Sequence, residues 1–457
     1  MRIDVNWRWL CVGSLLLGAC WGCSRPNSVE EVSVDPTQAP PDIARPEVQS
    51  QDWPAWRGPQ GNGIVDGQDV PVEFSATKNV VWKTPVPGRG HSSPTIVGDR
   101  VYLATAVGDG VPPQDDGVQL VLCFDRKDGA ILWQTEIHRG GFDPHLHAKN
   151  TQASSTIACD GERLFIAFLN DAAIHATALN LDGKILWQKN VGDFQSRYGY
   201  SASPAIYEAY VIIAGDNQGG GFLAALNRET GEIVWRKARP ADVSYASPAI
   251  LHLGGRDQVV LPGCDQLASY DPLTGEQLWS VPGTTQACVG TAVQYGDFVF
   301  ASGGFPGKET ICVNASGTPT AQWRNTVKCY VPSLLQTEGN IYAFTDNGIA
   351  HCWDAKTGAE RWKARLGGGD ISASPILVQD RLYIGNERGT IFVIRAQPGE
   401  YELLAENQLG DEMFASPAVA YGQLFLRTAD SSSGTRQETL YCIASADSAA
   451  GVPLESE

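Results

Sequence analysis

The sequence predicts an all-β protein, an eight-bladed β-propeller of four-stranded antiparallel blades whose last blade is closed by an N-terminal strand. Two repeats support this prediction: a hairpin turn that ends in a tryptophan, and a Ser-Pro that opens an apolar strand. Most copies of the second repeat lie 42 to 48 residues apart. That spacing is typical of one four-stranded propeller blade.

The hairpin turn is clearest in residues 270–279, YDPLTGEQLW. An apolar strand end, an Asp, a Thr-Gly and a second strand that ends in Trp indicate a tight turn. We expect each tryptophan to be structural, because it can bury a large apolar area between adjacent blades. The tryptophans at this phase are Trp82, Trp133, Trp187, Trp235, Trp279, Trp323 and Trp362.

The second repeat opens each unit with Ser-Pro or a variant of it. Successive first residues are 62, 48, 44, 43, 42, 42 and 42 apart, which makes eight units. The eighth unit supplies only three strands, and residues 80–82 can supply the fourth. This pairing would join the two ends of the chain and remove open sheet edges. The copies begin at Ser93, Ser155, Ser203, Ser247, Gly290, Pro332, Ser374 and Ser416.

The chain begins with a targeting segment, residues 1–20. Its apolar run is about half the length that a bilayer span needs, so we expect a signal peptide. Residues 17–20, LGAC, resemble the lipobox of bacterial lipoproteins, which implies lipid attachment at Cys20. The alternative is an ordinary signal peptide in which Cys20 has no special role.

Composition divides the remaining chain. Residues 21–50 are rich in Pro and polar residues, which predicts a disordered tether. Residues 51–78 form an N-terminal cap segment, in which Trp53 and Trp56 either cap one face of the ring, as we expect, or form a binding motif. Residues 79–445 form the propeller, and residues 446–457 a disordered tail.

The charge of the chain argues against a nucleic-acid partner. The net charge is −17, and no stretch concentrates Lys and Arg as phosphate binding requires. We expect a monomeric propeller.

The cysteines fall into two groups. Cys123, Cys312, Cys352 and Cys442 share a repeat position that favours a small side chain, too far from blade to blade for a disulfide. Cys264, Cys288 and Cys329 lie in loops on one face, where a disulfide between two of them is an open alternative in an oxidising compartment.

Binding is expected on the face that carries the B-to-C and D-to-A loops, because the first unit has two insertions there, residues 107–118 and 137–150. The residues that precede innermost strands should surround the channel mouth. The expected binding residues are Arg89, His91, His145, His147, Lys149, Asn150, Arg197, Tyr198, Tyr245, Lys328, Tyr330, Asp370 and Glu412.

No catalytic motif or metal site is predicted. His145 and His147 could offer two metal ligands, but no third ligand is fixed by spacing, and we expect a solvated loop.

Together, the lipobox, the Ser-Pro strand starts and the Asp-x-x-Thr-Gly-x-x-x-Trp turns resemble the PQQ-like repeat propellers, over about residues 53–444. One branch of that family, the quinoprotein dehydrogenases, holds pyrroloquinoline quinone (PQQ) and usually calcium in the channel. The other, the BamB-type lipoproteins, binds no quinone and serves as a scaffold in outer-membrane protein assembly. This chain is short for the enzyme branch and has no adjacent Cys-Cys pair; Asn150, Asp370 and Glu412 are the only calcium or base candidates on the expected face.

We therefore expect a lipid-anchored, non-catalytic scaffold on the periplasmic side of the cell envelope, with a protein partner and no cofactor. The alternative is a PQQ-dependent oxidoreductase with quinone and calcium in the channel.

Overall fold

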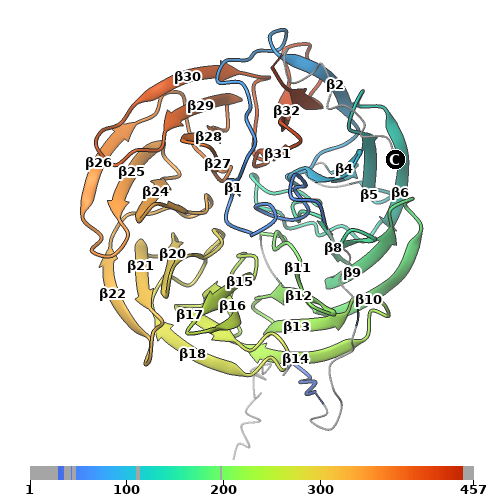
Figure 1. Ribbon diagram of the computed structural model, residues 1–457. Coiled ribbons are helices and arrows are strands. Elements are labelled where there is room, and N and C mark those ends of the chain that lie inside the picture. Colours follow the sequence, from blue (N-terminus) through green and yellow to red (C-terminus); the bar gives the residue numbers. More distant parts are fainter. Residues whose placement is uncertain (1–28, 35–42, 44–47, 110–113, 196–197, 446–457) are drawn as a thin grey trace, which may run out of the picture.

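The computed structural model describes residues 29–34, 43, 48–109, 114–195 and 198–445. In these residues 33 strands form eight sheets around a central channel, which confirms the predicted propeller (Figure 1). No helix in the described part of the chain is long and apolar enough to cross a membrane. The signal segment with Cys20 and the tail 446–457 lie outside the described residues.

The first four blades follow one another along the chain, each running from the channel outward. Blade one is β3 (Thr95–Val97), β4 (Arg100–Val107), β5 (Val118–Asp125) and β6 (Ile131–Arg139). Blade two is β7 (Ala158–Cys159), β8 (Arg163–Asn170), β9 (Ala173–Asn180) and β10 (Ile185–Asp193). Blade three is β11 (Ala205–Tyr207), β12 (Tyr210–Gly215), β13 (Gly221–Asn227) and β14 (Ile233–Arg239). Blade four is β15 (Ala249–Leu253), β16 (Arg256–Gly263), β17 (Gln266–Tyr270) and β18 (Gln277–Pro282).

The remaining blades repeat this arrangement, except that the eighth takes its outer strand from the N-terminal part of the chain. Blade five is β19 (Val293–Tyr295), β20 (Phe298–Gly303), β21 (Glu309–Asn314) and β22 (Thr320–Asn325). Blade six is β23 (Leu335–Thr337), β24 (Asn340–Phe344), β25 (Ile349–Asp354) and β26 (Glu360–Arg365). Blade seven is β27 (Ile376–Val378), β28 (Arg381–Gly385), β29 (Thr390–Arg395) and β30 (Leu403–Gln408). Blade eight is β31 (Ala418–Ala420), β32 (Gln423–Asp430), β33 (Gln437–Ile443) and β2 (Val80–Val86).

The closing strand is longer than the sequence predicted. β2 pairs with β33 in antiparallel register from Val80↔Ile443 to Val86↔Glu438. The strand predicted at residues 80–82 is therefore confirmed, and four further residues extend the pairing along the outside of blade eight.

The N-terminal cap segment enters the ring, which its composition did not predict. Trp53 is buried and forms a bridge with Ile96 on the innermost strand of blade one. Further along, β1 (Ile64–Val65) pairs in parallel with β27 and adds a fifth strand to blade seven. The segment thus runs across the centre of the ring, as the blue trace in Figure 1 shows.

Part of the expected disordered tether is also paired. Val32 and Arg236 exchange backbone hydrogen bonds of 3.0 and 2.9 Å at the outer edge of β14. The Arg236 side chain donates to the Glu30 carbonyl at 2.7 Å, and the backbone N–H of Ala238 donates to the Glu31 carboxylate. For residues 30–32 the prediction of disorder is wrong, because the open edge of an outer strand offers unpaired backbone groups.

The repeated tryptophans connect neighbouring blades. In six of them the indole Nε1–H donates to a carbonyl in the C-to-D connection of the next blade, at 2.8 to 3.1 Å. In five of these the ring also lies against the turn glycine, where a Cβ would come within 2.4 to 2.7 Å. Trp279 differs: its Nε1–H donates to Gln258 in its own blade.

The cysteines at the small-residue position pair directly with these tryptophans across the sheet. Cys123 faces Trp133, and Cys442 faces Trp82 in the same register. The described cysteines are all free and buried, so the structure contains no disulfide between Cys264, Cys288 and Cys329.

Candidate functional site

A cavity of about 520 Å³ fills the channel on the side of the B-to-C and D-to-A loops. At the narrow part of the channel, Ser and Thr residues that precede the innermost strands form a ring, called the hydroxyl ring below. At seven junctions between blades, a backbone N–H donates to the hydroxyl of the next blade at 2.8 to 3.1 Å, including Ser416 to Ser93 across the closure. The repeated Ser-Pro motif thus supplies both the donor and the acceptor of a hydrogen-bonded ring.

Trp56 replaces the ring contact at the junction of blades four and five. Its indole Nε1–H donates to the Thr291 hydroxyl at 2.8 Å. The side chain lines both the cavity and a second hollow of about 610 Å³ on the opposite side, so it separates the two. The channel therefore ends at Trp56.

Arg57 fixes the position of the chain segment that contains Trp56. Its guanidinium is buried and donates to the carbonyl of Leu334 at 2.9 Å and to that of Asn62 at 2.8 Å. Burial lowers the pKa of Arg57 to about 9, because no carboxylate compensates the desolvation.

The structure brings nine of the thirteen expected binding residues together around the cavity. They are His91, His147, Lys149, Asn150, Tyr198, Tyr245, Lys328, Tyr330 and Asp370. His145 and Glu412 lie elsewhere: His145 is exposed beside a separate hollow, and Glu412 pairs with Arg436. Arg89 lies beside the insertion and donates to Ala148 at 3.5 Å, and Arg197 lies outside the described residues.

The insertion that carries Lys149 crosses the cavity mouth. The Lys149 ammonium lies 2.8 Å from Asp370 and 2.8 Å from Glu387, both on blade seven. Lys149 itself precedes blade two, so this contact joins blades that are not neighbours. On the near side, Asn150 donates to the Tyr198 carbonyl at 2.5 Å, and His147 packs edge-on against the Tyr198 ring.

The charges of the cavity are arranged in internal pairs. Asp346 accepts backbone hydrogen bonds from Tyr330 and Val331 at 3.1 and 3.0 Å, and Lys328 lies 3.8 Å away. Burial raises the pKa of Asp346, although these donors act in the opposite direction. Burial also raises the pKa of Tyr330, and the nearby Tyr245 and Asp346 add to the effect.

Several lining residues are not predicted from the sequence: Phe305, Asp346, Glu387 and Phe414. Phe305, Asp346 and Glu387 each lie two residues beyond the end of a second strand, in blades five, six and seven. These three residues therefore share one position of the repeat, and the repeat predicts that position as directly as it predicts the positions before the innermost strands.

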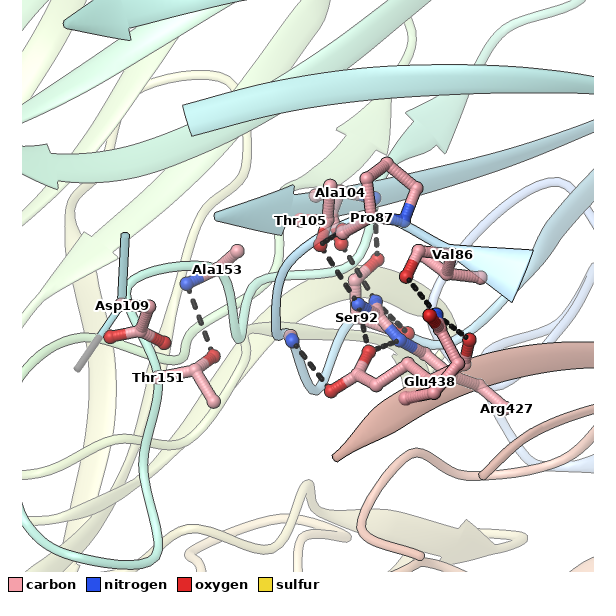
Figure 2. Close-up of polar contacts among 12 residues, drawn as sticks. Val86, Pro87, Ser92, Ala104, Thr105, Asp109, Thr151, Ala153, Arg427 and Glu438 are labelled. Carbon is pink, nitrogen blue, oxygen red and sulfur yellow. Dashed lines mark hydrogen bonds and ion pairs between the residues drawn. The ribbon is translucent and has the colours of Figure 1, made fainter. Parts of the chain in front are cut away.

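A buried ion pair lies next to the cavity where the ring closes (Figure 2). Arg427 on blade eight donates to Glu438 at 2.6 Å and reaches blade one, where it donates to the Ala104 carbonyl at 2.7 Å and the Thr105 hydroxyl at 3.1 Å. A Cβ on Gly90 would lie 2.7 Å from this guanidinium, so only glycine fits there.

His91 lies between this ion pair and the cavity. Its ring stacks on Phe414 with 4.4 Å between centroids. Burial lowers the pKa of His91 well below its ordinary value, and the positive charges of Arg89 and Arg427 lower it further. The imidazole is therefore neutral at pH 7.

The lining does not fit the quinone and calcium of the enzyme branch. PQQ is a tricarboxylate, which requires cationic partners, yet both lining lysines already contact carboxylates. Calcium requires six to eight oxygen ligands. Asn150 binds the Tyr198 carbonyl, Asp370 binds Lys149 and Glu412 lies outside the cavity. Among the described residues no group of three His, Cys, Asp or Glu side chains could hold a metal ion.

The fold and the two repeats define the chain as an eight-bladed PQQ-like repeat propeller. Residues 62–191, 117–364 and 356–440 match the family described as "Outer membrane protein assembly factor BamB", and the chain belongs to that family. One relative, the BamB protein of Burkholderia pseudomallei, is 24% identical over 384 residues, which are 80% of this chain and 91% of the relative.

Solved structures of both branches have the same fold. BamB from Moraxella catarrhalis superposes with a TM-score of 0.55 at 15% identity, covering 79% of this chain and 96% of that one. A europium-containing methanol dehydrogenase superposes with a TM-score of 0.63 at 12% identity, covering 87% and 98%. The fold is therefore common to an outer-membrane protein assembly factor and a dehydrogenase, and function has to be argued from the site.

Proposed function

We propose that this chain is a non-catalytic, protein-binding propeller with a role in outer-membrane protein assembly at the cell envelope. The observation that carries the proposal is the family match, which spans residues 62–440. The internally paired cavity charges support it, since they leave neither a ligand set for calcium nor a free cation for a quinone carboxylate among the described lining residues.

The binding surface in this proposal is the cavity mouth and the loops around it. Phe305 and Tyr198 are 50% and 39% exposed there, and aromatic side chains are enriched at protein–protein interfaces. We propose a monomeric propeller that presents this face to its partner while a lipid on Cys20 holds it on the periplasmic side of the membrane.

Site-specific photo-crosslinking in intact cells tests the partner. A crosslinker at position 305 should capture a component of the outer-membrane assembly machinery or one of its client proteins, identified by mass spectrometry. A crosslinker at Val81, which is also exposed but lies on the outer strand of blade eight, is the control. Equal capture at both positions, or capture at neither, would contradict the proposed face.

Two further measurements test the anchor and the absence of a cofactor. Labelling with an alkyne fatty acid should mark the full-length protein and not the Cys20→Ser variant. Titration of the protein with PQQ and calcium should give no saturable heat; one-to-one binding would favour the PQQ-dependent oxidoreductase instead.

A further inference from the structure

The cavity mouth contains a pair of carboxylates held in a fixed arrangement. The backbone N–H of Glu387 donates to the Asp370 carbonyl at 2.8 Å. The Ser372 hydroxyl donates to the Glu387 carboxylate at 2.6 Å. Asp370 precedes the innermost strand of blade seven and Glu387 follows the second, so the rigid blade positions both side chains.

The structure seats a cation on this pair. The Lys149 ammonium lies 2.8 Å from each carboxylate. Burial lowers the pKa of Lys149, but the hydrogen bonds that its ammonium donates to Asp370 and Glu387, together with their charges, outweigh this effect and raise the pKa, so the amine is protonated. The geometry is that of an ammonium site occupied by the chain itself.

Lys149 is held weakly enough to be replaced. Its side chain is 44% exposed, and that of Asp370 is 54% exposed. Ion pairs between exposed side chains contribute little to stability, because solvent screens them and ordering two long side chains costs entropy. Glu387 is only 15% exposed, so its charge would be costly to leave unpaired, and a cation that replaced Lys149 would be favoured there.

The rest of the lining also suits a cation. Without Lys149, the charged lining residues are one lysine and three carboxylates. Tyr198, Tyr245, Tyr330, Phe305 and Phe414 supply aromatic rings. The structure already places one cation over such a ring, since the Lys328 ammonium lies 5.2 Å from the Tyr330 ring centroid.

We propose that Asp370 and Glu387 bind a lysine or arginine side chain of a protein partner, and that Lys149 occupies their site in the unbound protein. The proposal rests on the proposed protein-binding function and names the chemistry by which this face recognises its partner. Phe305 favours a protein over a free amine as the source of the cation, because a small amine would leave this half-exposed ring uncovered.

Calorimetry with the full-length protein tests the site. The probe is the peptide Ac-Gly-Lys-Gly-NH2, and its neutral analogue contains norleucine in place of lysine. Lys149→Met removes the internal cation, so we expect the lysine peptide to bind this variant about tenfold more tightly than the unsubstituted protein. The norleucine peptide should bind neither. Lys78→Met, which removes a lysine from an exposed pair with Glu73 outside the cavity, is the matched control and should change nothing.

A triple variant separates this site from nonspecific binding. Asp370→Asn and Glu387→Gln, added to Lys149→Met, should abolish peptide binding while the thermal unfolding midpoint stays unchanged. The absence of any gain in Lys149→Met, or a gain that survives in the triple variant, would overturn the proposal. Butylamine that binds Lys149→Met as tightly as the peptide would overturn the assignment to a protein side chain.

Crosslinking distinguishes this proposal from the broader one. Equal capture of the partner through position 305 by the unsubstituted protein and by the Asp370→Asn/Glu387→Gln variant would leave the protein-binding function intact and remove the basic side chain as its determinant. Loss of capture only in the variant would support both. Capture by neither would contradict the proposed function itself.

Discussion

Two junctions of the ring are held together in different ways. Blade eight joins strands from both ends of the propeller, and between it and blade one Trp82 donates to the turn of blade one at 2.8 Å and the backbone N–H of Ser416 donates to Ser93 at 3.1 Å. The buried Arg427–Glu438 pair adds a third connection, which reaches the backbone of blade one.

Between blades four and five both repeat contacts are different. Trp279 donates within its own blade, and Thr291 accepts from Trp56 of the N-terminal cap segment. Both junctions are covalently continuous, since residues 87–94 connect β2 of blade eight to β3 of blade one. The junction of blades eight and one keeps the full set of repeat contacts, whereas the junction of blades four and five is where the cap segment inserts.

Removing the buried charge should weaken the closure most. Arg427→Met leaves Glu438 buried with only Arg436 as an ionic partner, so we expect a loss of about 3 kcal/mol in the free energy of unfolding. Urea denaturation measures it. Arg395→Met, which breaks pairs on the surface, should cost less than about 1 kcal/mol. Equal losses in the two variants would show that the closure has no special importance.

Truncating the tryptophan at each junction should also cost more stability between blades eight and one than between blades four and five. Trp82 is almost fully buried against blade one, so Trp82→Ala should destabilise the protein by about 3 kcal/mol, within the range for aromatic truncation in a core. Trp279 is only partly buried, and Trp279→Ala should cost about 1 kcal/mol less. Thermal unfolding of both variants measures the difference, and the reverse order would contradict the comparison.

Each contact of the hydroxyl ring should contribute less to the free energy of unfolding than the buried ion pair or the tryptophans do. Ser93→Ala leaves the buried backbone N–H of Ser416 without its acceptor, which should cost about 1 to 3 kcal/mol. Thr291→Val removes only the acceptor of the Trp56 indole, and we expect a loss of about 1 kcal/mol. If urea denaturation showed a larger loss of stability for Thr291→Val than for Ser93→Ala, the junction of blades eight and one would be the weaker of the two.

The smallest expected effect on the free energy of unfolding comes from Asp109, and this effect depends on pH. The pKa of Asp109 depends in part on Glu438 and Arg436. Burial raises its pKa from 3.8 to about 6, so the folded protein holds this proton more tightly than the unfolded chain does. Its contribution is therefore most favourable below pH 3.8 and declines as the pH rises to about 6. We expect a decline of about 1 kcal/mol, less than full burial would give, because Asp109 is partly exposed. Asp109→Asn should remove this difference in unfolding free energy between pH 4 and 7, and an unchanged pH profile would contradict it.

The sequence predicts most of the fold, because each blade repeats the same local requirements. The three inner strands of blade seven, residues 376–378, 381–385 and 390–395, lie where the turn and Ser-Pro repeats predict them. In blades two, five and six the predicted first residue of the Ser-Pro repeat lies one position too early. The hydroxyl ring contains Thr156, Thr291 and Ser333 at these places, because the residue with the hydroxyl makes the repeated contact.

The contacts between distant segments could not be predicted in this way. The strand β1 has two residues and pairs with blade seven in parallel, so it carries no repeat signal. The Lys149 contact depends on where an insertion crosses the mouth, which no local pattern determines. The site residues predicted before innermost strands were mostly placed around the cavity, but their partners after the second strands were missed.

The hydroxyl ring also affects how such a chain could evolve. In six of the eight repeats one Ser or Thr donates through its backbone and accepts through its side chain, so such a blade carries both halves of its connections to its neighbours. A duplicated or deleted blade would therefore leave no unmatched donor at the new junction. The number of blades could change by recombination without new contacts being invented, and the closing strand β2 would rejoin whichever blade came last.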